Sequence, residues 1–189
     1  MNQTAMDSKK EDRLQKARDS WSNQGSKRPP FAIDPKEGQR SVWDFPRPPV
    51  TEKVTERVLI KYLGKTIVNT QNALAVLETA SPPTYYIPKE DIEMDLLEQI
   101  PVKSSFCEWK GKANYWALKE NNNQPVAWSY TNPFEEFQEL KDHLAFCPQH
   151  LECFVGESPV KAQPGEFYAG WITTDLTGPF KGDYGTGHW

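Results

Sequence analysis

The stretch VLIKYLGKTIV, residues 58–68, decides the class of fold. Apolar residues recur at every second position from Val58 to Tyr62, which is the period of a strand with one buried face. Gly64-Lys65 interrupts this pattern before apolar residues return, as in a tight turn between two paired strands. The stretch therefore predicts a β-hairpin.

Strand patterns continue through the middle of the chain. Short runs of β-branched, aromatic and aliphatic residues make strand candidates of residues 73–79, 84–87, 114–118, 125–130, 144–146 and 153–155. Three asparagines at residues 121–123 have the composition of a turn and predict a second hairpin. Helical spacing is confined to short helices or helical turns near residues 89–97 and 132–140. Because successive hairpins pair antiparallel, we expect a mainly β fold, a compact antiparallel sheet or barrel-like domain with one or two short helices.

The chain is long enough for one domain with a sizeable core and two extensions. We place the domain at residues 42–160, between a polar and proline-rich extension at 1–41 and a glycine- and aromatic-rich extension at 161–189. Within the first extension, residues 8–21 form either a short amphipathic helix or a mobile tail. The aromatic residues of the last extension dock either on this domain or on a second copy of it. The second alternative predicts a homodimer held by the extensions.

Charge and cysteine content narrow the class of protein. The formal net charge is -4, and basic residues are concentrated in the N-terminal extension. The acidic remainder argues against sequence-independent binding of nucleic acid, which needs clustered Lys and Arg. Three cysteines without a CxxC pair fit the reducing cytosol. Because the sequence has no apolar leader and no run of ~20 apolar residues, we expect a soluble, cytoplasmic protein that does not enter membranes.

The stretch FCEWKGKANYW, residues 106–116, combines polar chemistry with large aromatic residues. Cys107 lies three residues from Lys110, and an ammonium near a thiol raises its thiolate fraction and hence its nucleophilicity. A buried, inert cysteine explains the same residues equally well. Alternatively, Lys110-Gly111 brings a cation beside bare backbone, where a ligand carboxylate or phosphate can approach. Cys107 and Lys110 are therefore candidate catalytic or binding residues.

Five further residues are candidates for a ligand-binding pocket: Glu78, Tyr86, Trp109, Trp128 and Tyr130. Aromatic residues more often fill a core than line a site, but alternate positions of a strand let some of them line a concavity. An aromatic pocket with a lysine, a histidine and a carboxylate at its rim would suit a small anionic or planar ligand.

His143 is the histidine that we favour for acid–base or ligand-binding work, since a neighbouring carboxylate can tune an imidazole near neutrality. A plain surface histidine is the simpler interpretation. His143, Cys147, His150 and Cys153 have spacings that superficially resemble a zinc site, but Pro148 and strand-like flanks keep them from one helical face. We predict no metal ligands, and the sequence identifies no cofactor. It contains no Ser-His-Asp, Walker or Rossmann pattern.

Five ordered motifs carry a family resemblance: WDFPRPP (43–49), LETASPPTYYIPKEDIEMDLLE (77–98), CEWKGKANYW (107–116), AWSYTNP (127–133) and KDHLAFCP (141–148). Over residues 42–155 the chain resembles the family catalogued as domain of unknown function 427 (DUF427), which some classifications also label nucleotidyltransferase-like. The resemblance implies a compact, mostly β domain and carries no established reaction. The family commonly has Pro where this chain has Glu108, between Cys107 and Trp109.

The nucleotidyltransferase label implies chemistry that these residues support poorly. Polymerase-β-like transferases need a Gly-Ser turn and an Asp-x-Asp pair that holds two magnesium ions. Gly25-Ser26 lies in the polar extension, and Asp91, Glu93 and Asp95 have the pattern of a solvated acidic face. We therefore predict a binder of a small ligand. The alternatives are an interaction or oligomerisation module, which uses the proline-rich arm and the aromatic tail, and a nucleotidyltransferase-like enzyme. Whether the chain catalyses a reaction stays open.

Overall fold

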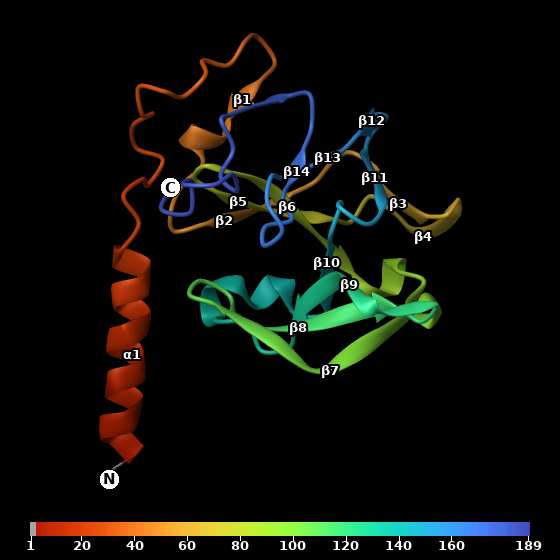
Figure 1. The fold of residues 1–189 in the computed structure, drawn as a ribbon, viewed down its shortest axis with the longest axis horizontal. Helices are drawn as coiled ribbons and strands as arrows, with labels where there is room; N and C mark the ends of the chain where they lie inside the picture. The colour runs from red at the N-terminus through yellow and green to blue at the C-terminus, as the bar shows by residue number, and fades with distance from the viewer. Residues whose placement is uncertain (1–2) are drawn as a thin grey trace.

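Strands dominate the fold, as the sequence predicts. In the computed structural model, which describes residues 3–189, seven strands form an open antiparallel sheet (Figure 1). In spatial order they are β2 (Val50–Lys53), β5 (Leu74–Glu78), β6 (Ser81–Pro88), β10 (His143–Phe146), β9 (Asn121–Tyr130), β8 (Gly111–Leu118) and β7 (Leu97–Cys107). The mainly β prediction is confirmed. Strands β2 and β7 are the edges of this sheet, so it does not close into a barrel.

A second sheet contains the hairpin predicted from residues 58–68. Its strands in order are β12 (Ser158–Pro159), β11 (Glu152–Val155), β3 (Val58–Tyr62) and β4 (Lys65–Thr70). Leu63 and Gly64 have φ values of 48° and 79°, the left-handed pair of a two-residue hairpin turn. Two small pairings involve the extensions: β1 (Arg40–Ser41) with β15 (Leu176–Thr177), and β13 (Lys161–Ala162) with β14 (Trp171–Ile172).

Strand β6 separates two apolar cores because its side chains alternate between the faces of the sheet. Tyr85 and Ile87 belong to the larger cluster of buried apolar residues, here called the main core, which also contains residues of β3 and β4. Tyr86 joins a smaller cluster, here called the second core. The second core consists of Val76, Tyr86, Trp109, Ala113, Tyr130, Phe137, Leu140 and Ala145. It contains three of the predicted site residues.

The predicted short helices form as 3-10 turns. The region 89–97 folds into η2 (Lys89–Asp91) and η3 (Met94–Leu96), and the region 132–140 into η4 (Glu135–Leu140). A further turn, η1 (Val42–Asp44), opens the predicted domain. The three-residue segments form one turn each, and the six residues of η4 are interrupted by non-helical backbone at Phe137, so no 3-10 run is long.

Strand β6 begins earlier than its prediction, at Ser81, so Pro82 and Pro83 lie inside the strand. Both prolines stand where the β5–β6 register shifts, and β10 pairs with β6 only from Tyr86 onward. The missing N–H groups therefore interrupt no regular ladder, which is why two prolines are tolerated here.

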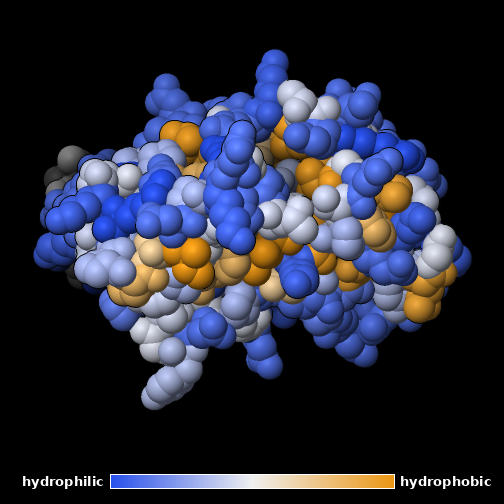
Figure 2. All heavy atoms as spheres, turned by 90° about the horizontal axis from the view of Figure 1, so that it is seen from above, coloured by the Kyte–Doolittle hydropathy of each residue, from blue (hydrophilic) through white to orange (hydrophobic). Residues whose placement is uncertain are grey.

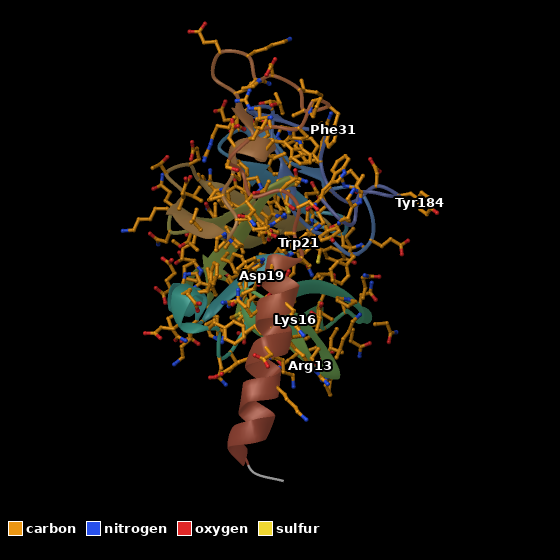
Figure 3. All side chains as sticks on the ribbon, turned by 90° about the vertical axis from the view of Figure 1, so that its left-hand side faces the viewer. Arg13, Lys16, Asp19, Trp21, Phe31 and Tyr184 are labelled. Carbon is orange, nitrogen blue, oxygen red and sulfur yellow. The ribbon has the colours of Figure 1, made fainter. Side chains whose placement is uncertain are left out.

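The N-terminal extension forms α1 (Gln3–Asp19), the helical one of the two interpretations of residues 8–21 (Figure 1). The helix is not amphipathic as predicted, because Ala17 is exposed and Trp21 lies beyond its end. Two basic residues in its last turn suit the negative end of the helix dipole. After α1 the chain brings Trp21 against the domain body (Figure 3). None of the helices in the described residues has the length and apolar character needed to span a membrane.

Two tryptophans of the C-terminal extension dock within the chain, as in the first of the two alternatives, while Phe167 and Tyr184 stay exposed. Trp171 is fully buried, and its Nε1 donates to the Phe146 carbonyl at 3.0 Å. Trp189 stacks on Phe31 with ring centroids 5.0 Å apart and meets Trp43 edge-on at 5.2 Å. The face seen in Figure 2 is mainly hydrophilic, with a broken row of apolar residues rather than one broad patch. Both extensions thus use much of their aromatic surface within the chain.

Arg47 joins the N-terminal extension to the sheet. Its side chain is 1% exposed and forms an ion pair with Glu78 at 3.1 Å. The guanidinium also donates to the carbonyls of Asn23 at 2.8 Å and Thr79 at 2.9 Å, and lies 4.5 Å from the ring centroid of Trp21. Because a buried guanidinium is costly without partners, these contacts hold residues 21–23 against the β5–β6 turn.

Replacing Arg47 with Met should lower the free energy of unfolding by about 3 kcal/mol, because two carbonyls and Glu78 lose their donor. Urea denaturation measures this change. The matched control is Arg57→Met, since the Arg57 guanidinium bonds Asn69 at the exposed surface and should contribute less than about 1 kcal/mol. Equal losses in the two variants would contradict the structural role of Arg47.

Candidate functional site

The turn between β7 and β8 presents the central residues of the site. Cys107 pairs with Gly111, and Glu108, Trp109 and Lys110 form the loop between them. Gly111 has a φ of 95°, which side-chain-bearing residues rarely adopt. A Cβ at Gly111 would lie 3.5 Å from the Asn132 carbonyl, so its bare backbone faces the start of η4 rather than open space.

Lys110 is a buried cation in this turn, only 8% exposed. Its Nζ lies 5.6 Å from the ring centroid of Phe137 in the second core. Burial alone would lower its pKa, but Cys107, Tyr86 and the two nearby carboxylates, Glu78 and Glu108, outweigh burial, so the pKa is raised and the ammonium stays charged.

The carboxylates near Lys110 are engaged elsewhere. Glu78 forms its ion pair with Arg47, and Glu108 Oε1 accepts a hydrogen bond from Trp21 Nε1 at 2.8 Å. Within residues 3–189, no side chain or carbonyl forms a hydrogen bond or ion pair with Lys110 Nζ. A buried ammonium therefore keeps unused donors beside the second core.

Trp109 supplies a second unused donor. Its side chain is 6% exposed, and its Nε1 has no hydrogen-bond partner in the part of the chain that the structure describes. The Arg18 guanidinium lies 5.2 Å from its ring centroid. Because a guanidinium can only donate hydrogen bonds, it offers no acceptor to the indole N–H. Buried donors in folded proteins normally have partners, so the unpaired indole N–H of Trp109 is unusual.

Aromatic side chains surround these donors. Tyr86 lies between Trp128 and Tyr130, with ring centroids 6.4 Å from each. Burial raises the pKa of both Tyr86 and Tyr130, so their hydroxyls remain protonated and can donate. Cys107 and Trp128 pack against the second core. The structure thus brings together Cys107, Lys110 and four of the five predicted pocket residues, with Glu78 at the edge.

His143 is not brought into this group. It starts β10 one position before the Leu144–Ser129 pair, and its Nδ1 lies 2.9 Å from the Lys141 carbonyl. No contact with Cys107 or Lys110 is among those of the described residues. Its candidate role in acid–base or ligand-binding work remains a prediction, and no contact with the other candidates supports it.

The residues whose spacing resembles a metal site do not form one in the described part of the chain, and Asp91 among them has a structural role. No three His, Cys, Asp or Glu side chains of the described residues are grouped as metal ligands would be. Asp91 Oδ2 accepts hydrogen bonds from the Thr70 hydroxyl and from Asn72 Nδ2, and so holds the β4–β5 connection.

The sequence did not predict that residues of the two extensions, here called the cover, lie over the site. Trp21 packs on the second core (Figure 3), and Arg18 Nε donates to the Glu108 carbonyl at 2.8 Å. Lys181, from the C-terminal extension, places its Nζ 3.6 Å from the Trp21 ring centroid. Burial lowers the pKa of Lys181 to about 8. The one available signal was a lone tryptophan in a polar tail.

Cys107 should react with a thiol probe at neutral pH before the other two cysteines. Burial raises the pKa of Cys147 to about 12 and that of Cys153 further, so both stay as thiols. Replacing Lys110 with Met should slow the Cys107 reaction, because the attacking sulfur loses a neighbouring ammonium. Stopped-flow labelling with mass mapping measures this rate.

The control for this measurement is Lys112→Met, which removes an exposed lysine two positions away. Protection of all three thiols until the chain unfolds would establish Cys107 as structural and end any nucleophilic role for it.

One family model matches the chain. It is named NTP_transf_9, is described as Domain of unknown function (DUF427), and covers residues 50–157. No curated protein matches the chain. The matched range includes the turn with Lys110 but leaves out Trp21, Arg47 and Lys181, so the cover of the site lies outside it.

Proposed function

The chain belongs to the DUF427 family, and from that premise we propose that its domain binds a small planar anion at Lys110. The observation that carries the proposal is the buried Trp109 Nε1, which has no hydrogen-bond partner among the described residues, next to the 8%-exposed Lys110. A carboxylate or phosphate would accept from both, while the rings of the second core would stack on a planar group.

Charge balance favours an anion over a neutral ligand. The Lys110 ammonium is buried and charged, and the two nearest carboxylates each satisfy another donor. An anion placed there would neutralise Lys110 without breaking the Arg47–Glu78 ion pair. A neutral molecule of the same shape would leave the ammonium without a partner, which costs free energy in a buried site.

Trp21 covers this site, and we propose that a ligand displaces it. Its indole already acts as a planar group over the second core and is held through Nε1 by Glu108. Because Trp21 belongs to the N-terminal extension, the extension would compete with the ligand. Removing the indole should therefore expose the pocket.

Salicylate is a suitable probe because it is planar and anionic, and salicylamide is its neutral counterpart. We expect salicylate to bind Trp21→Ala about tenfold more tightly than the native chain. The difference, ~1.4 kcal/mol, arises because the ligand no longer has to displace the indole. Lys110→Met in the Trp21→Ala background should abolish binding, because the charge that attracts the carboxylate is gone. Ligand-detected NMR titration measures both effects.

Lys112→Met in the same background is the matched control and should bind as Trp21→Ala does, since Lys112 is exposed. Equal affinity for salicylate and salicylamide, or no binding by any variant, would contradict an anion site at Lys110. Circular dichroism of each variant separates a lost site from a lost fold.

An interaction module remains the second candidate, and one observation favours it. Phe31, Ile33, Phe167 and Tyr184 of the extensions are large apolar or aromatic side chains that stay exposed. A homodimer through the extensions should then appear as twice the chain mass in light scattering and should be lost on removal of residues 161–189. A nucleotidyltransferase activity rests on the name of the family model alone, and the free thiols suit a cytosolic location.

A further inference from the structure

A cleft of about 430 Å³ opens on the main-core face of the sheet. It lies where β2, β5 and β6 meet residues of both extensions, and its wall includes Arg40, Glu52, Glu56, Tyr85 and Asp175. Tyr85 and Tyr86 are neighbours on β6 that belong to different cores, so the cleft and the Lys110 site lie on opposite faces of the sheet. The volume is that of a site for a small organic molecule.

Tyr85 presents a polar atom without a partner to this cleft. The residue is 8% exposed, and its ring lies against Trp171 with centroids 4.9 Å apart. Tyr85 lines the cleft, and its hydroxyl forms no hydrogen bond with any residue of the described range 3–189. The side chain is thus held by its buried ring while its hydroxyl keeps a donor and an acceptor that the described part of the chain does not use.

The charges around Tyr85 are unbalanced. Arg40 and Glu52 neutralise each other in an ion pair at 3.1 Å. Glu56 and Asp175 have no ion pair among the residues described, and together with burial they raise the pKa of Tyr85. Lys53 is the remaining cation of the wall. Two unpaired carboxylates thus accompany one unpaired ammonium, and the cleft carries an excess negative charge beside the Tyr85 hydroxyl.

We propose that this cleft binds a small organic cation that carries a primary amine or a guanidinium group. The bound nitrogen donates to the Tyr85 hydroxyl and pairs with Asp175 and Glu56, which are charge-assisted contacts. The aliphatic part of the ligand lies on the apolar wall that includes Leu77 and Pro83. Asp175 belongs to the C-terminal extension, so the site is complete only when that extension is docked.

Agmatine is the probe, and citrate is the anionic comparison. Isothermal titration of the full chain at low salt should show saturable binding of agmatine and none of citrate at this site. Asp175→Asn and Glu56→Gln should each weaken agmatine binding about tenfold, because each removes one charge-assisted partner. Asp183→Asn is the matched control, since Asp183 is an exposed acid of the same extension outside the cleft.

Tyr85→Phe is the variant that keeps the ring and the fold while removing only the unpaired hydroxyl, and it should also weaken agmatine binding. Lys110→Met should leave it unchanged, which separates this proposal from the anion site. Absence of saturable agmatine binding would overturn the proposal. Equal weakening by Asp183→Asn would also overturn it, because the binding would then reflect surface charge rather than the cleft.

Discussion

The buried guanidinium of Arg47 is the interaction on which the arrangement of the site depends. A charge removed from water needs partners, and Arg47 takes them from three residues: Asn23 in the N-terminal extension, and Thr79 and Glu78 at the end of β5. This requirement places Trp21 over the second core. It also occupies Glu78, so the nearby ammonium of Lys110 is left without a carboxylate partner. One ion pair therefore sets both the cover and the charge of the candidate site.

The alternation of β6 gives the sheet two faces with different surroundings. Tyr86 belongs to the second core with Trp109, while Tyr85 borders the cleft beside Asp175. The environments differ in sign, because a buried ammonium dominates one face and unpaired carboxylates dominate the other.

The extensions are part of both surfaces rather than appendages. The family model covers residues 50–157, yet Trp21 and Asp175 lie outside that range. The two extensions also meet each other, since Lys181 lies over the Trp21 ring and its Nζ donates to the carbonyl oxygen of Trp189 at 3.1 Å. Any ligand that moves Trp21 therefore disturbs contacts that reach the C-terminus of the chain.

The sequence by itself determined the mainly β class, the hairpin at residues 58–68 and the grouping of aromatic residues around the turn at Lys110. These features follow from alternation and turn composition, which act between residues close in the chain. Only the tertiary structure decided that Trp21 covers the site, that Glu78 serves Arg47 and that His143 lies apart from the thiol. Trp21 and Glu108 are 87 positions apart, and no local pattern encodes a hydrogen bond over that separation. Such contacts depend on which surfaces the folded sheet brings together, because burial and the pairing of buried charge are settled only when the whole chain packs.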